Sequence, residues 1–407
     1  MSRCREPSGT RSSHVRLGSP DLLNGIMPRP PHILFAGGGA PGHLYPGLAV
    51  AAHVVQRIPE VMATFVGGGR PVERHIVRAA GFRHAHLPSQ PAPQSALHAI
   101  RFVTDNVAGY WASRWYLKEQ RVSLVVGLGG AASAPAVRAA MSRGIPTVML
   151  EQNMVPGRVT RWLAPSATTV CAGFESTRSY FPSSVPLVVT GNPARPAFEQ
   201  LYRQKMNRGD ATAVHDSHHE KRLIIIGGAG GARSINQNIP AALARLRDQL
   251  CGWRIVHQSG EGQLQDTERR YREAGVEALV VAFIDEMAPV MFDADLVVCR
   301  AGGTTLAELA LAGLPAVLVP YPPVMDYHLP NAEAFSSAGA ATIIDETDLA
   351  GSLEDALVEN LSPLLVDDTL RAKMATSMRR LACPEAAARV TDSIHKALYR
   401  NSVRLAA

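Results

Sequence analysis

Glycine-rich loops carry the residues of this sequence that are best placed to do chemistry. The first loop runs from Gly37 through Ala40, Pro41 and Gly42 to His43, directly before an apolar, helix-like stretch. A glycine loop that opens a helix offers N–H groups and the positive end of the helix dipole to an anion, typically a phosphate. A tight turn that needs positive φ explains the glycines equally well, but it does not explain a histidine at the start of the helix.

The loop over residues 299–308 is the most informative, because it follows a strongly apolar run and then opens a helix. N–H groups at such a helix start favour a pyrophosphate. Thr304 and Glu308 are four residues apart and therefore share one helix face. A diphosphate bound at the helix start would leave Glu308 one turn away, within reach of ribose hydroxyls. The alternative for Glu308 is an ordinary solvated helix charge.

The first loop also contains the pattern G-x-G-x-x-G, the fingerprint of dinucleotide binding. That interpretation requires an acidic residue about 20 residues further on, at the end of the second strand, to hold the ribose. Here the second strand-like run ends in three glycines, residues 67–69, and the nearest carboxylate, Glu73, lies beyond the turn. Pro41 also removes a backbone donor from the loop. The sequence therefore argues against NAD binding.

Further polar residues follow other strand-like runs. Glu151, Gln152 and Asn153 come directly after the run 147–150, and Arg195 lies where the two predicted domains join. Ligands of open α/β sheets bind at the carboxyl ends of the strands, so we expect these side chains to face a ligand. An arginine at the junction could clamp a phosphate.

Short apolar runs bounded by glycines alternate with helix-like segments along the chain. Runs of four or five apolar residues indicate strands buried on both faces of a parallel sheet. Two sets of six runs therefore predict an α/β fold with two doubly wound, Rossmann-like domains. The expected strands are His32–Ala36, Ala63–Val66, Ser123–Val126, Thr147–Leu150, Thr168–Cys171 and Leu187–Thr190, then Leu223–Ile226, Arg254–His257, Leu279–Ala282, Leu296–Cys299, Ala316–Val319 and Ala341–Ile344.

A polar stretch separates the two sets of strands. Residues 199–221 are rich in His, Asp and Asn and show no period, so we expect a linker there. The first domain would then span residues 31–198 and the second 222–383. A last helical stretch within residues 384–407 could return to the first domain.

Composition restricts the class of protein. At 407 residues the chain exceeds what one core usually supports, and with 46% hydrophobic and 19% charged residues it is not disordered in bulk. Its five cysteines are far apart and form no C-x-x-C, which favours a reducing compartment over disulfides or a zinc site. The net charge of +6 permits an anionic substrate, nucleic acid or an anionic membrane and selects none of them.

The ends of the chain and its apolar stretches suggest no spanning segment. Residues 1–30 are rich in Arg, Ser and Pro and lack the apolar core of a signal peptide. We expect them to be a disordered extension, or translation to start at Met27. The longest apolar stretch, residues 309–325, is interrupted by glycine and prolines, so we expect no transmembrane helix.

Taken together, these motifs resemble those of the MurG family, the UDP-N-acetylglucosamine:N-acetylmuramyl-(pentapeptide)-pyrophosphoryl-undecaprenol N-acetylglucosaminyltransferases of bacterial peptidoglycan synthesis. The resemblance extends from about Pro31 to the C-terminus, and its specificity lies in the order and spacing of the motifs. They are Gly42–Ala51, Glu151–Asn153, Thr190–Arg195, Gly230–Arg233 with Asn236, His257–Gly260, Phe283–Met287, and Cys299–Gly302 with Glu308.

The resemblance implies a GT-B fold, in which two Rossmann-like domains face each other across a cleft, and a hexosyltransferase activity. The C4 hydroxyl of N-acetylmuramic acid in lipid I would attack the anomeric carbon of UDP-GlcNAc in one inverting step that yields lipid II. His43, or alternatively Glu151, would act as the base. Helix N-termini and Arg195 would stabilise the departing UDP. No metal ion or other cofactor is implied.

The resemblance also implies which residues hold the donor. Ile284 would lie beside the uracil, the segment 303–308 would hold diphosphate and ribose, and Asn153 and Arg195 would reach in from the first domain and the junction. The full donor set is Ala40, Pro41, Gly42, Asn153, Arg195, Ala229, Ile284, Gly303, Thr304, Thr305, Leu306, Ala307, Glu308 and His328.

Three sites depart from the family pattern. Ala40 and Pro41 stand where the family has Thr-Gly, Ala229 replaces a serine, and His328 replaces a glutamine. The changes at Ala40, Pro41 and Ala229 remove hydroxyl and backbone donors, whereas His328 can still donate a hydrogen bond. They leave two alternatives open: another GT-B enzyme of UDP-sugars, such as an epimerase or a glycolipid glycosyltransferase, or a non-catalytic nucleotide-sugar-binding homologue.

A lipid-linked acceptor implies a patch that faces a membrane. A helix-like segment that starts at Ile100 interleaves aromatic residues, Trp115 among them, with basic residues, which suits an anionic interface. The competing interpretation is a core helix with a solvated basic edge. We expect a peripheral protein on the cytoplasmic face of the inner membrane, with UDP-GlcNAc and lipid I as partners and no nucleic acid. The expected membrane-facing residues are Ile100, Val107, Tyr110, Trp111 and Arg114.

Overall fold

The computed structural model describes residues 30–38, 41–58, 60–88, 96–208, 220–228, 230–322 and 327–405, with the backbone alone for 96–102 and 400–405. From Pro31 onwards the chain forms one compact unit. Four predictions therefore lie outside the described residues: the extension up to residue 29, Ala40, Ala229 and the side chain of Ile100.

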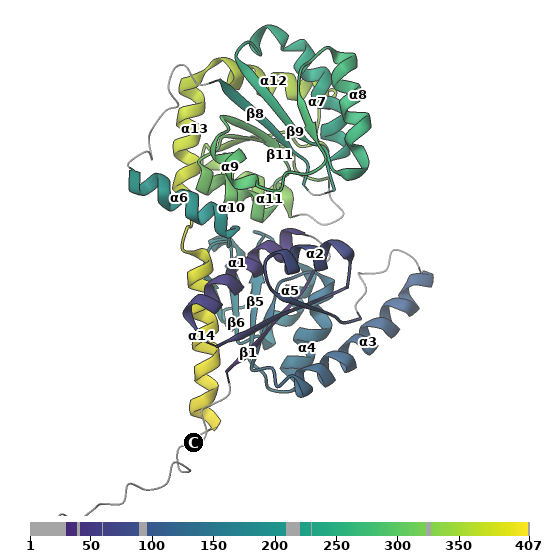
Figure 1. Cartoon of the computed structure of the whole chain (residues 1–407), viewed down its shortest axis with the longest axis vertical. Coiled ribbons are helices and arrows are strands. Elements are labelled where there is room, and N and C mark those ends of the chain that lie inside the picture. Colours follow the sequence, from purple (N-terminus) through teal and green to yellow (C-terminus); the bar gives the residue numbers. More distant parts are fainter. Residues whose placement is uncertain are drawn as a thin grey trace, which may run out of the picture. The chain divides into compact units, whose positions relative to one another are not determined.

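The first sheet contains seven parallel strands within the described residues, in the order β3-β2-β1-β4-β5-β6-β7 (Figure 1). Its central strands are buried along their whole length because helices cover both faces of the sheet. The strands are β1 His32–Ala36, β2 Met62–Gly67, β3 Arg83–His86, β4 Leu124–Gly127, β5 Thr147–Glu151, β6 Thr169–Ala172 and β7 Leu187–Val189.

One strand of this sheet, β3, was missed by the sequence analysis. It pairs with β2 at the sheet edge, where Thr64 lies opposite Arg83. Its sequence, Arg-His-Ala-His, is polar, and none of its residues is fully buried. A search for apolar runs cannot find such a strand, since an edge strand buries too little surface to require them.

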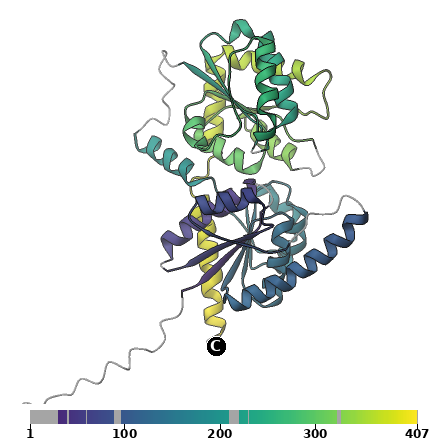
Figure 2. The ribbon, with the colours of Figure 1, turned by 45° about the vertical axis from the view of Figure 1, so that its right-hand side comes forward.

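The second sheet repeats the plan with six parallel strands in the described chain, in the order β10-β9-β8-β11-β12-β13 (Figure 2). All six were predicted within two residues of their observed ends. The predicted α/β class with two Rossmann-like domains is therefore confirmed. The strands are β8 Lys221–Ile226, β9 Trp253–Gln258, β10 Leu279–Val281, β11 Leu296–Cys299, β12 Ala316–Leu318 and β13 Ala341–Ile343.

Helices cover both faces of each sheet (Figures 1 and 2). Ile224 and Ile226 of β8 enter one buried cluster, and Leu223 and Ile225 enter the other, as expected for alternating side chains in a doubly covered strand. The helices are α1 Pro41–Arg57, α2 Pro71–Ala79, α3 Ala96–Glu119, α4 Ala134–Ser142, α5 Arg158–Leu163, α6 Pro196–Arg208, α7 Arg233–Arg245, α8 Leu264–Ala274, α9 Met287–Phe292, α10 Gly303–Ala312, α11 His328–Ser337, α12 Leu353–Val366, α13 Asp368–Arg380 and α14 Ala386–Leu405.

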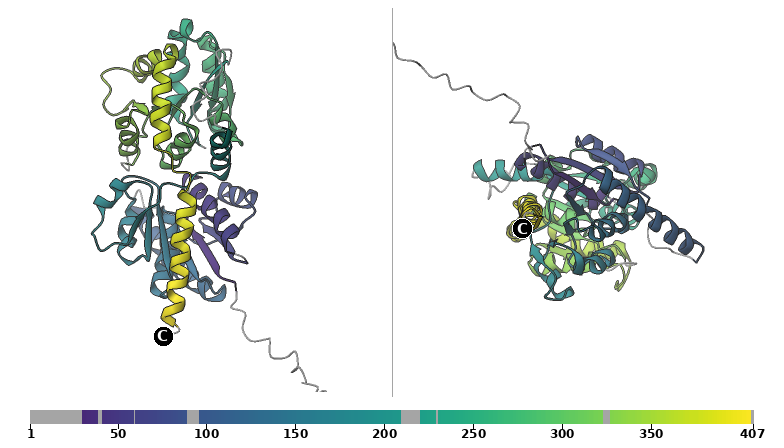
Figure 3. Two further views of the ribbon diagram at one scale, coloured as in Figure 1. Left: turned by 90° about the vertical axis from the view of Figure 1, so that its left-hand side faces the viewer. Right: turned by 90° about the horizontal axis from the view of Figure 1, so that it is seen from below.

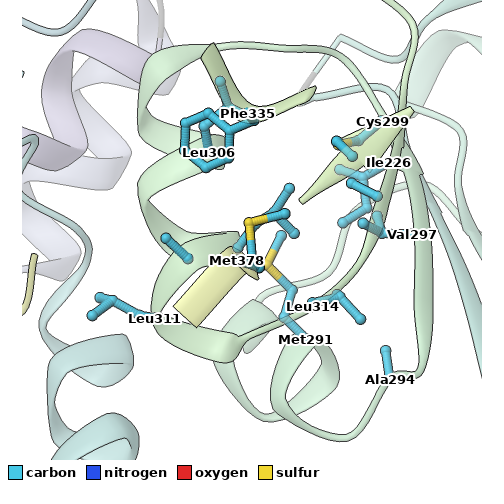
Figure 4. Packing of buried hydrophobic residues seen from close by; sticks show 14 of the residues in the cluster. Ile226, Met291, Ala294, Val297, Cys299, Leu306, Leu311, Leu314, Phe335 and Met378 are labelled. Carbon is cyan, nitrogen blue, oxygen red and sulfur yellow. The ribbon is translucent and has the colours of Figure 1, made fainter. Parts of the chain in front are cut away.

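One cluster of the second half shows how Leu306, a residue of the predicted donor set, is placed. Figure 4 shows Leu306 of α10 pointing into a core that also contains Phe335, Met378 and Ile226. Leu306 is fully buried there. The helical period turns this side chain away from Thr304 and Glu308 and toward the sheet, so the Leu306 side chain supports the fold.

The predicted linker is only partly irregular. Residues 199–208 belong to α6, and Phe198 in the first turn of that helix is fully buried. The polar composition of the segment hid this helix, because only Phe198 anchors its first turn in the core. Residues 209–219 lie outside the described chain.

The last helix, α14, lies along the first sheet (Figure 3). Ala387, Val390 and Ile394 share a buried cluster with Ile33 and Phe35 of β1. We therefore use "first half" for residues 31–198 together with α14, and "second half" for residues 220–383.

The described residues contain neither a membrane-spanning helix nor a metal-binding cluster of side chains. No helix among these residues combines the length and the apolar character that crossing a bilayer requires. Nor do their His, Cys, Asp and Glu side chains gather in a group of three or more that could hold a metal ion.

Candidate active site

Each sheet has one point at which its winding reverses, and ligands of such folds bind at the carboxyl ends of the strands there. In the first half the neighbours are β1 and β4, which are followed by Gly37 and by the loop 128–130. In the second half they are β8 and β11, which are followed by Gly227 and by the loop 300–302. The predicted glycine loops thus occupy the two switch points.

His43 lies over the loop that follows β4. A Cβ placed on Gly129 would stand 3.4 Å from Cδ2 of His43, and one on Gly130 would stand 3.5 Å from its Nδ1. Both glycines have positive φ, 90° and 71°, so the loop needs glycine for its backbone as well as for the space under the imidazole. Nδ1 of His43 is buried and has no hydrogen-bond partner among the described residues. Burial lowers the pKa of His43, so the ring is neutral near pH 7.

Glu151, the second candidate base, is held by its own loop. Its carboxylate accepts hydrogen bonds from the N–H of Asn153 at 3.1 Å and the N–H of Gly157 at 2.9 Å. The Asn153 amide also donates to it at 3.3 Å. Burial raises the pKa of Glu151, and these hydrogen bonds oppose that shift. The carboxylate therefore acts as the anchor of residues 153–157.

The start of α10 touches the first half at two places. Thr304 donates from Oγ1 to the carbonyl of Gly42 at 2.8 Å, and the carbonyl of Gln152 lies against Cα of Gly303. No side chain caps this helix start. The start of α1, with His43, and the start of α10 are thus in direct contact.

Arg195 and Glu308 bind each other. Nε and Nη2 of Arg195 donate to the two carboxylate oxygens of Glu308 at 2.6 and 2.7 Å. The guanidinium lies between the rings of Tyr45 and Phe198, at 4.8 and 5.1 Å from their centroids. Burial alone would lower the pKa of Arg195, but the carboxylate of Glu308 outweighs it and raises that pKa. The sequence predicted both residues as ligand contacts and gave no sign that they form a pair.

Asn153 links the two halves instead of pointing freely at a ligand. Its Oδ1 accepts from Nδ2 of Asn331 at 3.0 Å, and Oδ1 of Asn331 accepts from the N–H of Met154 at 2.8 Å. Asn331 also donates to the carbonyl of Ala301, next to the start of α10. This bridge fixes the loop after β5 beside the loop after β11.

The loop after β8 rests on a saturated hydrogen-bond network. His257, fully buried, meets Tyr271 Oη at 3.0 Å through Nδ1 and Asn236 Oδ1 at 2.9 Å through Nε2. Burial lowers the pKa of His257 to about 3. Nδ2 of Asn236 in turn donates to the carbonyl of Ser259 at 2.8 Å. These residues of the predicted motifs therefore support the loop from behind.

Ile284 is positioned by a neighbouring amide. Its N–H donates to Oε1 of Gln258 at 3.0 Å, and Nε2 of Gln258 donates to the carbonyl of Gly228 at 3.0 Å. Gln258 thus ties the segment around Ile284 to the loop after β8. Sequence reasoning noted Gln258 only as part of a motif.

A second network, which the sequence analysis missed, surrounds Arg300. Arg300 donates to Glu346 at 2.8 Å and to Ser234 at 2.8 Å, and Ser234 donates to Glu346 at 2.6 Å. Nη1 of Arg300 also donates to the carbonyls of Val319 and Pro320, both at 3.0 Å. Arg300 lies within the motif Cys299–Gly302, but nothing in the local sequence marks Glu346 as its partner.

His328 begins α11 and lies close to the start of α10. Its Nδ1 accepts from the N–H of Tyr321 at 3.3 Å, so in the neutral ring Nε2 carries the proton. A Cβ on Gly302 would stand 3.9 Å from that Nε2. Burial, together with the charge of Arg300, lowers the pKa of His328 to about 4. The side chain is therefore a neutral hydrogen-bond donor near the candidate anion site.

The remaining donor predictions fall around the same two helix starts. Pro41 and Gly42 form the first turn of α1, and Gly42 is exposed. Thr305 and Ala307 are partly exposed on α10, between the buried Thr304 and Glu308.

An Asp-x-Asp triplet, Asp293–Asp295, lies away from these loops. It precedes β11, at the amino end of the strand. Asp295 accepts from the N–H of Arg222 at 2.8 Å, and Asp293 pairs with the Arg222 guanidinium. The triplet therefore has a structural role at the opposite edge of the sheet.

Helix α3 exposes a row of apolar side chains. Val103, Val107, Trp111 and Trp115 are 57, 52, 61 and 65% exposed, and their spacing of four places them along one ridge. Val103 was absent from the predicted membrane-facing segment, which did include Trp115.

Tyr110 and Arg114 of the predicted set lie differently. Tyr110 is half-buried against the core of the first half and donates to Ser142 at 2.9 Å. Arg114 is also only partly exposed and donates to the same hydroxyl at 2.9 Å. The hydroxyl of Tyr110 thus lies beside Ser142 of α4, whereas the neighbouring ridge is exposed.

Comparison with known proteins agrees with this arrangement. Residues 33–172 match the glycosyltransferase family 28 N-terminal domain, and residues 222–390 match the C-terminal domain of the same family. This chain has relatives described as UDP-N-acetylglucosamine–N-acetylmuramyl-(pentapeptide) pyrophosphoryl-undecaprenol N-acetylglucosamine transferase. Those of Geobacter sulfurreducens and Stutzerimonas stutzeri are each 38% identical to this chain, over 89% of it and 97% of their own length.

Solved structures show the same relationship. The crystal structure of Acinetobacter baumannii MurG superposes with a TM-score of 0.69 at 28% identity, covering 90% of this chain and all of that one. The UDP-GlcNAc 2-epimerase of Neisseria meningitidis reaches a TM-score of 0.64 over the same share of this chain, but at 14% identity it shows the fold alone.

Proposed function

The chain belongs to the MurG family of N-acetylglucosamine transferases, and from this premise we propose that it moves N-acetylglucosamine from UDP-N-acetylglucosamine to the N-acetylmuramyl group of an undecaprenyl-diphosphate-linked acceptor. The product would be lipid II and the leaving group UDP. Relatives described as transferases of this kind match at 38% identity over most of the chain, whereas the epimerase shares only its fold.

One observation carries the proposal: the hydrogen bond from Thr304 to the carbonyl of Gly42. It joins the start of α10, an uncapped helix end suited to a diphosphate, to the start of α1, where His43 follows Gly42 directly. An anion-binding helix end and a neutral imidazole are thereby brought to one place, and they come from different halves. A transfer from a nucleotide diphosphate to a hydroxyl needs both groups side by side.

In the proposed reaction the C4 hydroxyl of the acceptor sugar attacks the anomeric carbon of the donor. His43 takes the hydroxyl proton as the new C–O bond forms, and the bond from the anomeric carbon to the diphosphate oxygen breaks with its electron pair going to UDP. A lowered pKa keeps His43 unprotonated near pH 7 and able to accept that proton. We assign the base to His43 rather than Glu151 because the Glu151 oxygens already hold Asn153 and Gly157.

The start of α10 supplies the proposed diphosphate site. N–H groups of Gly303, Thr304 and Thr305 and the helix dipole would meet the charge that develops on UDP. His328 would donate from Nε2 at the edge of this site, and Pro41 and Gly42 would border the sugar. The proposal invokes no metal ion, since these groups together with Arg195 are the ones assigned to the leaving group.

The uridine end is assigned to Ile284 and Glu308. Arg195 occupies one acceptor site on each oxygen of Glu308, and each oxygen keeps a further lone pair for a ribose hydroxyl. Asn153 would act through its bridge to Asn331, holding the loop after β5 against α10. Arg195 would thus fix the orientation of Glu308 as well as add positive charge.

The ridge on α3 supports a peripheral position on an anionic membrane. Two exposed tryptophans and two valines offer an apolar stripe, and Arg114 and Lys118 border it with positive charge. We propose that this stripe enters the cytoplasmic face of the inner membrane, where the acceptor's lipid is anchored.

An assay with both substrates tests the function. The purified chain is supplied with UDP-N-acetylglucosamine and a short-chain analogue of lipid I, and UDP and disaccharide product are measured together. We expect the two to appear in equal amounts. Binding of UDP-N-acetylglucosamine without any product would contradict the transferase and favour a non-catalytic homologue.

A further inference from the structure

Asn192 is a buried amide without partners. It lies between β7 and α6, directly after Gly191, whose φ of 78° only glycine adopts easily. Its residue exposure is 7%, and neither Nδ2 nor Oδ1 has a hydrogen-bond partner among the described residues. Burying such a group without partners costs about 1–3 kcal/mol. A side chain kept in that state needs a reason, and a ligand that pairs with it in the working complex is one.

The amide points at the start of α10. Its Nδ2 would be 3.2 Å from a Cβ placed on Gly303, the first residue of that helix. On its other side, the Asn192 Cβ would be 3.4 Å from a Cβ on Gly173. The carbonyl oxygen of Gln152 would clash with the Cβ on Gly303, so glycine at this position allows both that carbonyl and the Asn192 amide to approach the helix start closely.

The chemistry of the helix start selects an anion. α10 has ten residues and no side-chain cap, so its first N–H groups present partial positive charge. An amide N–H added to such a group of donors fits a phosphate oxygen. Other amides nearby are already saturated: Asn331 contacts Met154, Asn153 and Ala301.

We propose that Asn192 is a donor-binding residue whose Nδ2 donates to an oxygen of the UDP diphosphate at the start of α10. The inference rests on the proposed function and adds to it a residue from the junction between the halves. Asn192 thereby distinguishes a nucleotide with a diphosphate from a nucleoside.

Calorimetric titration with UDP and with uridine tests the proposal. Asn192→Ala should weaken UDP binding about tenfold or more, since a hydrogen bond to a charged group is lost, and leave uridine binding unchanged. Asn192→Asp has the same shape and should weaken UDP binding further, because a carboxylate repels the phosphate. The thermal midpoint of ligand-free Asn192→Ala should not fall, since the amide has no partner to lose.

A matched control is Asn360→Ala on α12, an amide that bonds only to its own helix at the carbonyl of Ala356. It should bind UDP as the wild type does. UDP affinities within about twofold of wild type in both Asn192 variants, or equal losses for UDP and uridine, would overturn the inference. Failure of the wild type to bind UDP would instead overturn the proposed function.

Discussion

The two halves of this molecule are built on one plan and use it differently. Each has a parallel sheet with a switch point where glycine loops follow two central strands. At the first switch point, Nδ1 of His43 is buried without a partner among the described residues. In the second half, both nitrogens of the buried His257 are bonded. The two histidines therefore have different roles. His43 of the first half has a ring nitrogen with no described partner, which can accept a proton, whereas His257 of the second half uses both ring nitrogens to hold neighbouring loops in place.

The two halves also differ in how many large apolar side chains their helices expose. On α3 of the first half, four large apolar side chains are exposed along one ridge. In the described part of the second half no helix exposes more than one such side chain: Val366 is the example on α12, and the exposed Leu279 lies on strand β10. An isolated apolar residue is ordinary, whereas a row of four indicates contact with a partner surface.

The largest effect expected from this comparison is on the reacting group. His43→Ala should lower kcat about 10²–10⁴-fold, since general base help is worth that much, while the Kd for UDP-N-acetylglucosamine stays unchanged. Steady-state kinetics and calorimetry measure the two quantities separately. His75→Ala, which removes an exposed histidine from α2, is the control and should change neither. A full loss of donor binding in His43→Ala would assign His43 to the donor site instead.

The next effect concerns the charge pair that joins the two halves, Arg195 of the first and Glu308 of the second. Arg195→Ala should lower the free energy of unfolding by about 3 kcal/mol, because it leaves the buried Glu308 carboxylate without its cation. Urea unfolding of the ligand-free protein measures this. Arg270→Ala breaks an exposed pair on α8 and should leave the unfolding midpoint nearly unchanged. Equal stability of Arg195→Ala and wild type would show that the pair does not support the fold.

A smaller effect is expected at the α3 ridge. Trp111→Ser should weaken binding to vesicles that contain anionic lipid by about tenfold, since one apolar side chain is worth about 1.5–3 kcal/mol when removed from water. Co-sedimentation with vesicles measures the change. Leu279→Ser, at an isolated exposed site of the second half, should have no effect. Equal losses in the two variants would remove the distinction between the two surfaces.

The smallest effect is expected at His328. His328→Gln should change the KM for UDP-N-acetylglucosamine by less than about threefold, because a pKa of about 4 keeps the imidazole neutral and an amide replaces both its donor and its acceptor. Initial-rate kinetics at varied donor concentration measure it. A change well above tenfold would mean that the ring itself, and not its hydrogen bonds, recognises the donor.

The fold could be predicted from the sequence wherever burial demands apolar residues. Strands such as β8 and β11 are apolar runs because helices cover both their faces. The edge strand β3 and the helix α6 could not be found in this way. Most of their residues are polar, and few of them are fully buried.

The candidate site was predictable in its loops and not in its partnerships. Glycines and His43 mark the two switch points, because turn geometry and helix starts have local signatures. The pairing of Arg195 with Glu308 joins residues 113 positions apart, and no local signature encodes it. The orphaned state of Asn192 is equally invisible in sequence, since it depends on what the fold does not bring near the amide.

The pH dependence of kcat at saturating concentrations of both substrates tests the central claim most directly. Only neutral His43 can accept the proton, so activity should be constant at high pH and fall as the pH drops through the His43 pKa, which burial holds below the ordinary 6.5. The same measurement on His43→Gln should show a low rate without that acid limb. An acid limb of the same midpoint in wild type and His43→Gln would contradict the assignment of the reacting group to the first half.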